Sequence, residues 1–253
     1  MKLKGKAVVV TGASRGIGRS IAEAFAAEGA NIAICARNPA QVDETVAALT
    51  ARGVKAWGAV VDVSDGPALQ AFVTRAGETL GGIDVLVSNV SAMDMGADEA
   101  AWTDMFTLDI LGAVRIFEAA KPFLERAGRE HGDAAFLLLA SMAAGEAMAP
   151  SAYGAMKAAL IHYAKGLARQ YAPSKVRCNV ISPGNIYFPD GYWAGIEANH
   201  PGVYAAHMAR NPTGRMGGPD EVADLAVFLG SPRSAYTTGA NVVIDGAKSL
   251  RVG

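Results

Sequence analysis

Cysteine is scarce in this chain of 253 residues, which contains only Cys35 and Cys178. Each lies in a strand-like apolar segment, and neither has a second ligand at the spacing of a metal site. The four histidines form no metal motif either. A disulfide framework and a metal centre are therefore not indicated, and we expect two buried, reduced thiols, which suit a cytoplasmic protein.

The sequence also lacks an excess of one charge and a long hydrophobic run. Lys and Arg total 23 against 24 for Asp and Glu, without a dense basic run, so neither nucleic acid nor a membrane surface is an expected partner. The longest apolar run, residues 134–144, is shorter than the ~20 residues that span a bilayer. The basic N-terminus leads into a glycine-rich loop, which indicates a first strand and not a signal peptide.

Short β-branched runs alternate with longer stretches of helical period along the chain. Buried strands are expected within residues 6–12, 31–36, 54–63, 83–88, 134–140, 176–182 and 240–246. Helices are expected between them, for example within 17–29, 39–53 and 66–82. Such alternation predicts a doubly wound α/β fold, a parallel sheet with helices on both faces. Without a linker or repeat, we predict one domain over residues 1–253.

Two segments interrupt the alternation. Residues 98–128 predict a helix that is too long for an ordinary crossover and apolar nearly all round, so we expect it to pack between subunits. Between Tyr187 and Tyr204, five of eighteen residues are aromatic, against 7% in the whole chain. This composition is typical of a mobile cap over an apolar ligand site, which we place within residues 185–213. A satellite core under a long loop is the alternative.

The stretch TGASRGIG, residues 11–18, follows a predicted strand and opens a predicted helix. In this context Gly12 permits a tight turn, Gly16 lets the backbone approach a pyrophosphate, and Gly18 allows close packing of helix on strand. The helix N-terminus supplies amide donors and positive potential for the phosphates. We therefore predict a dinucleotide-binding site.

The end of the second predicted strand indicates which dinucleotide binds. An NAD site needs an acidic residue there, ~20 residues after the glycine loop, to bind the ribose hydroxyls. Here Ala36 stands in that place, Arg37 follows it, and Arg15 lies in the glycine loop. Two guanidinium groups without a carboxylate suit the 2′-phosphate of NADP(H), which is the predicted cofactor. Ordinary solvated arginines are the alternative.

Tyr153 and Lys157 lie four residues apart in an alanine-rich predicted helix. At roughly 100° per residue, Lys165 and Arg169 belong to a polar stripe about 80–140° from Lys157, whereas Tyr153 lies only about 40° away on the other side. Lys157 therefore extends from a mostly apolar face, which costs free energy unless a ligand uses its charge. A snorkelling lysine beside a core tyrosine is the alternative.

Ser141 ends a predicted strand twelve residues before Tyr153. Ligands of such folds bind at the carboxyl ends of parallel strands, so the two residues can meet at one cleft. A free phenol titrates near pH ~10, and a neighbouring ammonium and an oxidised nicotinamide both favour its ionised form. We predict carbonyl reduction with Tyr153 as general acid and base, and with Ser141 bonded to the same substrate oxygen.

With these motifs in place, the sequence resembles the short-chain dehydrogenase/reductase family over essentially its whole length. TGASRGIG matches the TGxxxGxG loop of that family, and Ser141, Tyr153 and Lys157 match its Ser, Tyr and Lys. The resemblance implies a Rossmann-like sheet of seven strands, a homotetramer or homodimer built on two long helices, and oxidoreduction of alcohols and ketones. It also implies that Lys157 binds the nicotinamide ribose while acting on Tyr153.

The resemblance and the motifs together give two sets of candidate residues. The cofactor set is Gly12, Ser14, Arg15, Gly16, Ile17, Gly18, Arg37, Asp62, Val63, Asn89, Tyr153, Lys157, Pro183, Gly184 and Ile186. The substrate set is Met93, Asp94, Met142, Met148, Tyr187, Tyr192 and Trp193. The apolar and aromatic bias of the second set predicts a bulky or aromatic ketone.

Three positions depart from the family pattern. The family's NNAG appears as SNVS at residues 88–91, so Ser91 replaces a glycine that admits ribose and substrate. Asp109 stands at the asparagine that completes the catalytic set, and an ionised aspartate cannot donate a hydrogen bond to a proton relay through Lys157. Phe188 replaces a threonine that contacts the nicotinamide amide. We expect an active enzyme with an altered relay or pocket.

Two other functions stay open at this point. A 3-oxoacyl-carrier-protein reductase fits the general pattern but needs a basic docking surface, for which Arg126, Arg129 and Arg169 are weak candidates. A non-catalytic NADP(H)-binding sensor or scaffold is suggested by Asp109 and SNVS. The intact Ser141, Tyr153 and Lys157 argue against it.

Overall fold

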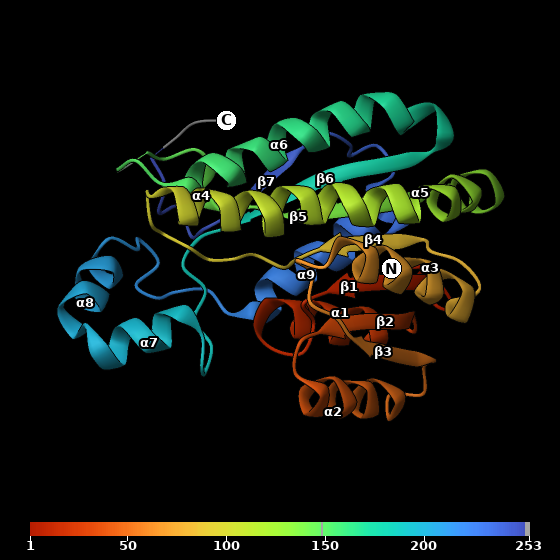
Figure 1. Ribbon diagram of the computed structural model, residues 1–253, viewed down its shortest axis with the longest axis horizontal. Coiled ribbons are helices and arrows are strands. Elements are labelled where there is room, and N and C mark those ends of the chain that lie inside the picture. The colour runs from red at the N-terminus through yellow and green to blue at the C-terminus, as the bar shows by residue number, and fades with distance from the viewer. Residues whose placement is uncertain (148, 251–253) are drawn as a thin grey trace.

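The computed structural model describes residues 1–147 and 149–250 and contains a seven-stranded parallel sheet in the order β3-β2-β1-β4-β5-β6-β7 (Figure 1). The strands are β1 (Ala7–Thr11), β2 (Asn31–Ala36), β3 (Ala56–Val60), β4 (Val85–Ser88), β5 (Ala134–Leu139), β6 (Val176–Pro183) and β7 (Asn241–Ile244). Each falls within a run that the sequence predicted or extends it by one residue. The prediction of a parallel seven-stranded sheet is confirmed.

Helices cover both faces of the sheet. One core lies between the sheet and α3 (Gly66–Leu80), α5 (Gly112–His131) and α6 (Ala152–Tyr171). The other lies between the sheet and α1 (Gly16–Ala27), α2 (Pro39–Thr50) and α9 (Pro219–Gly230). The doubly wound arrangement is therefore confirmed. Within the described part of the chain, none of the helices is both long and apolar enough to cross a membrane.

The helix boundaries follow from capping residues. The side chains of Asn38 and Asp65 accept hydrogen bonds from the backbone N–H groups of Gln41 and Ala68, and a proline follows each cap within two residues. Both features favour a helix start. The capping side chain accepts a hydrogen bond from a backbone N–H group that lacks a partner within the helix, and the proline fixes its own φ near the helical value. At the other end of α3, Gly81 adopts a left-handed conformation with φ of 83°. Glycine ends a helix in this conformation without the steric strain that a Cβ would cause.

The two edge strands differ from the expectation of fully buried strands. The residues of β3 and β7 are at most partly buried, and Val60 is 57% exposed. Each edge strand has a neighbouring strand on one side only, so its other side is not covered by the sheet. The apolar runs of the sequence resemble those of central strands, and this part of the prediction was wrong.

The segment predicted as one long helix consists of three parts. It begins with α4 (Glu99–Met105), which Asp98 caps, continues as the π-helical turn η1 (Phe106–Leu111), and ends with α5 at His131, three residues beyond the predicted boundary. A π-helical turn inserts extra backbone into a helix and changes the direction of nearby side chains. In this turn Asp109 is buried, at 1% exposure.

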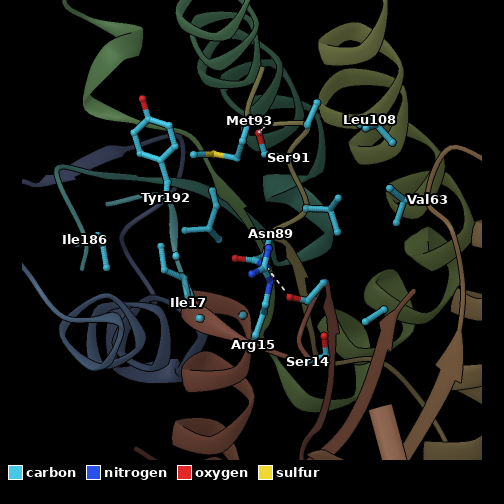
Figure 2. A pocket seen from close by; sticks show the side chains of 18 of the residues that line it. Ser14, Arg15, Ile17, Val63, Asn89, Ser91, Met93, Leu108, Ile186 and Tyr192 are labelled. Carbon is cyan, nitrogen blue, oxygen red and sulfur yellow. Dashed lines mark hydrogen bonds between the residues drawn. The ribbon is translucent and has the colours of Figure 1, made fainter. Parts of the chain in front are cut away.

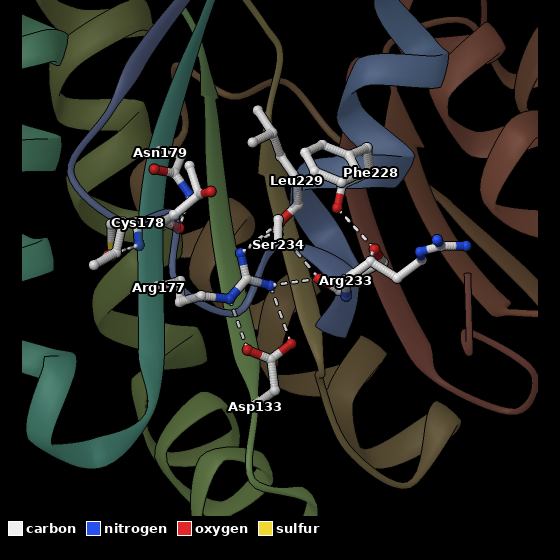
Figure 3. Close-up of polar contacts among 11 residues, drawn as sticks. Asp133, Arg177, Cys178, Asn179, Phe228, Leu229, Arg233 and Ser234 are labelled. Atoms are coloured by element: carbon white, nitrogen blue, oxygen red, sulfur yellow. Dashed lines mark hydrogen bonds and ion pairs between the residues drawn. The ribbon is translucent and has the colours of Figure 1, made fainter.

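A buried arginine joins α9 to the sheet at the edge where the strands begin. Arg177, near the start of β6, binds Asp133 through two hydrogen bonds of 2.7 and 3.0 Å (Figure 3). Its other donors reach the backbone oxygens of Leu229 and Ser231 and the hydroxyl of Ser234. The charge is thus fully bonded, as a buried guanidinium requires. This network lies at the amino ends of the strands, so it does not occupy their carboxyl ends, where a ligand can bind.

Candidate active site

A cavity of about 900 Å³ lies at the carboxyl ends of the strands. Its walls come from the glycine loop after β1, the ends of β2, β4, β5 and β6, and the segment that follows β6. Tyr192, Met93 and Ser91 lie at one end and Ser14 and Arg15 at the other, with Asn89 between them (Figure 2). A cavity of this size and position is typical of a dinucleotide and small-ligand site.

The glycine loop has the conformation that its sequence requires. Gly12 and Gly16 have φ of 67° and 54°, in the left-handed region that residues with a Cβ avoid. A Cβ on Gly18 would overlap the carbonyl oxygen of Gly12, so helix and loop touch closely here. Asn89 fixes the loop from β4, because its Nδ2 donates to the backbone oxygens of Thr11 and Gly12 at 3.1 Å each.

The start of α1 is suited to an anion. Its N-cap residue is Arg15, and no side chain among the described residues caps the first turn. The first amides of a helix need acceptors, and their positive potential favours a phosphate. A cradle shaped by glycine at a helix N-terminus fits the pyrophosphate of a dinucleotide, which Gly12, Gly16 and Ile17 would hold.

The structure brings the whole predicted cofactor set to the cavity, since each of those residues lines it. Arg37 is exposed at the end of β2. Hydrogen bonds from Ser64 lower the pKa of the nearby Asp62 carboxyl, and the charge of Arg37 adds a smaller effect in the same direction. The guanidinium of Arg15 donates to the backbone oxygen of Asp190 at 2.9 Å. Arg15 therefore joins the glycine loop to the segment after β6, and the expectation of a phosphate-binding arginine rests mainly on Arg37.

Tyr153, Lys157 and Ser141 line one region of the cavity. The Lys157 Nζ is 2.8 Å from Asp109 Oδ1, donates to the Leu139 backbone oxygen at 3.0 Å, and lies 5.5 Å from the centroid of the Tyr153 ring. Lys157 is only 2% exposed, so its charge is shielded from water. The expected separation of Lys157 from the polar stripe of α6 is present, because Lys165 and Arg169 are exposed.

Ser141 and Asp109 have defined hydrogen-bond roles. Ser141 Oγ accepts from the backbone N–H of Ala143 at 3.2 Å, which leaves its own proton for an oxygen in the cavity. Asp109 Oδ2 accepts from the backbone N–H of Ala92 at 3.0 Å. Asp109 is not among the described residues that line the cavity. Asp109 contacts Lys157 and the loop after β4 from the side that faces away from the cavity.

The predicted substrate set is only partly assembled. Met93, Asp94, Tyr192 and Trp193 line the cavity, whereas Met148 lies outside the described residues. Met142 and Tyr187 are not among the described lining residues, so the structure does not bring these two to the cavity. Met142 begins a short 3-10 turn. The Tyr187 hydroxyl donates to Glu197 at 2.6 Å, and its ring packs edge-on against Tyr204.

The aromatic segment forms α7 (Tyr192–Asn199) and α8 (Pro201–Ala209), which lie at one side of the molecule, beyond the sheet (Figure 1). None of the residues in these two helices is buried, which argues against the alternative of a satellite core. Phe188, just before them, lies over the glycine loop: a Cβ on Gly16 would be 2.6 Å from its ring.

Sequence reasoning missed several residues of the cavity wall, among them Gln41 and Asp190. Gln41 Oε1 accepts from the Ser14 hydroxyl at 3.1 Å, and Asp190 offers its backbone oxygen to Arg15. Both contacts join segments that lie far apart in the sequence. A single sequence carries no signal for such pairs, because any surface glutamine or backbone carbonyl has the same local pattern.

Comparison with known proteins agrees with this geometry. A family model described as enoyl-(acyl carrier protein) reductase matches residues 12–247. Among curated proteins, isoepoxydon dehydrogenase patN of Aspergillus clavatus is 35% identical over 252 residues, covering 96% of this chain and 95% of the relative. Oxidoreductase UcpA of Escherichia coli K12 is 34% identical over 261 residues, with 98% and 96% covered.

A solved structure gives the same result in three dimensions. L-sorbose reductase from Gluconobacter frateurii, complexed with NADPH and L-sorbose, superimposes with a TM-score of 0.90 at 30% identity, covering 100% of this chain and 99% of that one. The match extends over the sheet, both helical layers and the segment after β6. The family model, the relatives and the shared architecture lead to one conclusion: the chain belongs to the short-chain dehydrogenase/reductase family.

Proposed function

We propose that the protein is an NADP(H)-dependent oxidoreductase that interconverts a ketone and a secondary alcohol. The observation that carries this proposal is that Tyr153 and Ser141 line the same cavity while the ammonium of Lys157 lies 5.5 Å from the centroid of the Tyr153 ring. A phenol and a hydroxyl in one cavity provide a proton and a second hydrogen bond for a single oxygen atom.

The roles of the side chains follow from their positions. A bound nicotinamide supplies or accepts the hydride. In ketone reduction, Tyr153 donates its phenolic proton to the developing alkoxide, while Ser141 donates a hydrogen bond to the same oxygen. Lys157 stabilises the phenolate that remains, because an ammonium favours a nearby negative charge. In alcohol oxidation, the phenolate of Tyr153 removes the hydroxyl proton.

The preference for NADP(H) is supported by the end of β2. Arg37 is exposed at the cavity rim, and Ala36 occupies the place where a carboxylate would bind the ribose of NAD. A guanidinium binds a phosphate through charge-assisted hydrogen bonds. The similar L-sorbose reductase structure contains NADPH.

The substrate end of the cavity favours a bulky ketone. Met93, Tyr192 and Trp193 supply apolar and aromatic surface, while Ser91 and Asp94 supply polar groups. A ring or chain that also carries hydroxyl groups matches this mixture better than a purely aromatic ketone. Sugar reduction by the similar L-sorbose reductase supports the inclusion of hydroxylated ketones.

Assembly and location complete the proposal. We place a homotetramer or homodimer interface on α5 and α6, next to the exposed apolar side chains of Trp102 and Phe106. The buried thiols suit a reducing cytoplasm.

The experiment is to measure NADPH and NADH consumption by the purified protein with aromatic, cyclic hydroxylated and acyl-thioester ketones. Turnover with NADPH on the first or second class supports the proposal. Turnover only on the acyl thioester favours a 3-oxoacyl-carrier-protein reductase. Tight NADPH binding without turnover on any class contradicts it and favours a non-catalytic sensor.

A further inference from the structure

The buried contact between Asp109 and Lys157 joins three elements behind the cavity. Asp109 lies on η1, Lys157 on α6, and their charged atoms are 2.8 Å apart with side-chain exposures of 0% and 2%. The contact is an ion pair without hydrogen-bond alignment, because Asp109 Oδ1 receives no hydrogen bond from the described residues. The second carboxylate oxygen is fixed by Ala92, in the loop after β4.

We propose that Asp109 is a positioning residue that holds Lys157 beneath Tyr153 as its buried counter-ion and sets the pH range in which Tyr153 works. The inference rests on the proposed function of Tyr153. Asp109 is not a catalytic residue here, because it does not contact the cavity and acts only through Lys157.

The charge on Asp109 is what makes this role possible. Without it, the ammonium of Lys157 would be buried with the Leu139 backbone oxygen as its only other described hydrogen-bond acceptor. A buried charge needs a counter-charge or strong hydrogen bonds, and removal of one partner from a buried pair is costly. Because Ala92 also holds the carboxylate, Asp109 fixes the Lys157 head group relative to the loop that carries Ser91 and Met93.

The charged and titratable groups around this pair are few. Tyr153 faces Lys157 from the same helix, and Leu139 on β5 and the loop at Ala92 contribute only backbone groups. Asp104 on α4 lines the cavity but is exposed to solvent. The field at Tyr153 is therefore that of an ammonium partly cancelled by one carboxylate.

This cancellation gives a measurable consequence. Replacement of Asp109 by asparagine keeps the shape and the acceptor for Ala92 but removes the negative charge. The more positive site then favours phenolate, so the acid limb of the kcat/KM profile for alcohol oxidation should move to lower pH by on the order of one pH unit.

The matched control is Glu78→Gln. Glu78 lies on α3, away from the proposed interface helices, is exposed, and pairs with Arg75 at 3.6 Å, so the substitution also removes a carboxylate from an ion pair but in solvent. Its profile should coincide with that of the wild type. An acid limb of Asp109→Asn that also coincides with the wild type, in protein that binds NADPH, overturns the proposal.

A stability comparison tests the pairing without any turnover. Lys157→Met leaves the carboxylate of Asp109 buried and unpaired, whereas Asp109→Asn/Lys157→Met removes both charges. The double variant should therefore unfold at a higher urea concentration than the single variant. An equal or lower midpoint refutes the ion pair. If no ketone is reduced by the wild type, the proposed function fails while this comparison still decides whether Asp109 holds Lys157.

Discussion

The ammonium nitrogen of Lys157 lies 5.5 Å from the centroid of the Tyr153 ring, one turn away on α6. The spacing of four residues places both side chains on one face of the helix. That face lines the cavity, but Lys157 is 2% exposed and Tyr153 is 9% exposed. The pair is thus assembled by the helix itself.

Arg37 should determine the choice of cofactor. Arg37→Ala removes the guanidinium at the end of β2, and loss of a charge-assisted bond to the 2′-phosphate should raise the Kd for NADPH about 10- to 100-fold. The Kd for NADH, which lacks that phosphate, should stay within about twofold because no comparable bond is lost. Fluorescence titration with both cofactors measures this.

The control for Arg37 is Arg75→Ala, on α3, whose side chain is 71% exposed and pairs with Glu78 at 3.6 Å. It should leave both dissociation constants unchanged. Equal weakening of NADPH and NADH by Arg37→Ala would contradict the phosphate assignment.

Gly16 should tolerate no side chain. Gly16→Ala places a Cβ 2.6 Å from the Phe188 ring at a φ of 54°, so steric overlap and backbone strain should lower the free energy of unfolding by about 1–3 kcal/mol. The added methyl group also stands where a pyrophosphate approaches the backbone, so the Kd for NADPH should rise at least about tenfold.

Two variants separate these effects. Gly166→Ala lies on α6, where an added Cβ has open space, and should leave binding unchanged. Gly16→Ala/Phe188→Ala relieves the overlap and should recover part of the stability without restoring the affinity. Wild-type affinity of Gly16→Ala would mean that the loop does not hold a pyrophosphate.

The two cysteines should be chemically inert in the folded protein. Burial raises the pKa of both the Cys35 and the Cys178 thiol to about 12. Because pH 8 is far below this pKa, each thiol is neutral at that pH. Ellman's reagent at pH 8 should label neither thiol in the native protein and both after unfolding in urea. Rapid labelling of the native protein would show that one of the thiols is accessible.

The sequence was sufficient for the sheet, the glycine loop and the placement of Ser141, Tyr153 and Lys157 at one cavity. Local patterns determine these features: a strand buried on both faces appears in the sequence as an apolar run, and a spacing of four residues places two side chains on one face of a helix. Edge and central strands have similar runs, so the exposure of β3 did not follow from its composition.

Features that depend on contacts between distant segments did not follow from the sequence. The π-helical turn η1 points Asp109 at Lys157, and its sequence resembles an ordinary helix. Tyr187 was assigned to the pocket by its motif position, yet its hydroxyl bonds to Glu197 on α7. Arg15 bonds to Asp190, 175 residues later. Side-chain direction in loops and irregular turns depends on tertiary packing.

The most direct test of the central claim is to compare Tyr153→Phe with Tyr163→Phe. Both tyrosines lie on α6, but Tyr163 is not among the described residues that line the cavity. With NADPH and the best ketone, Tyr153→Phe should keep cofactor affinity and lose kcat by about 10²- to 10⁴-fold, because the general acid is gone. Tyr163→Phe should retain wild-type turnover. If Tyr153→Phe also turns over at the wild-type rate, Tyr153 is not the proton donor and the proposed mechanism is wrong.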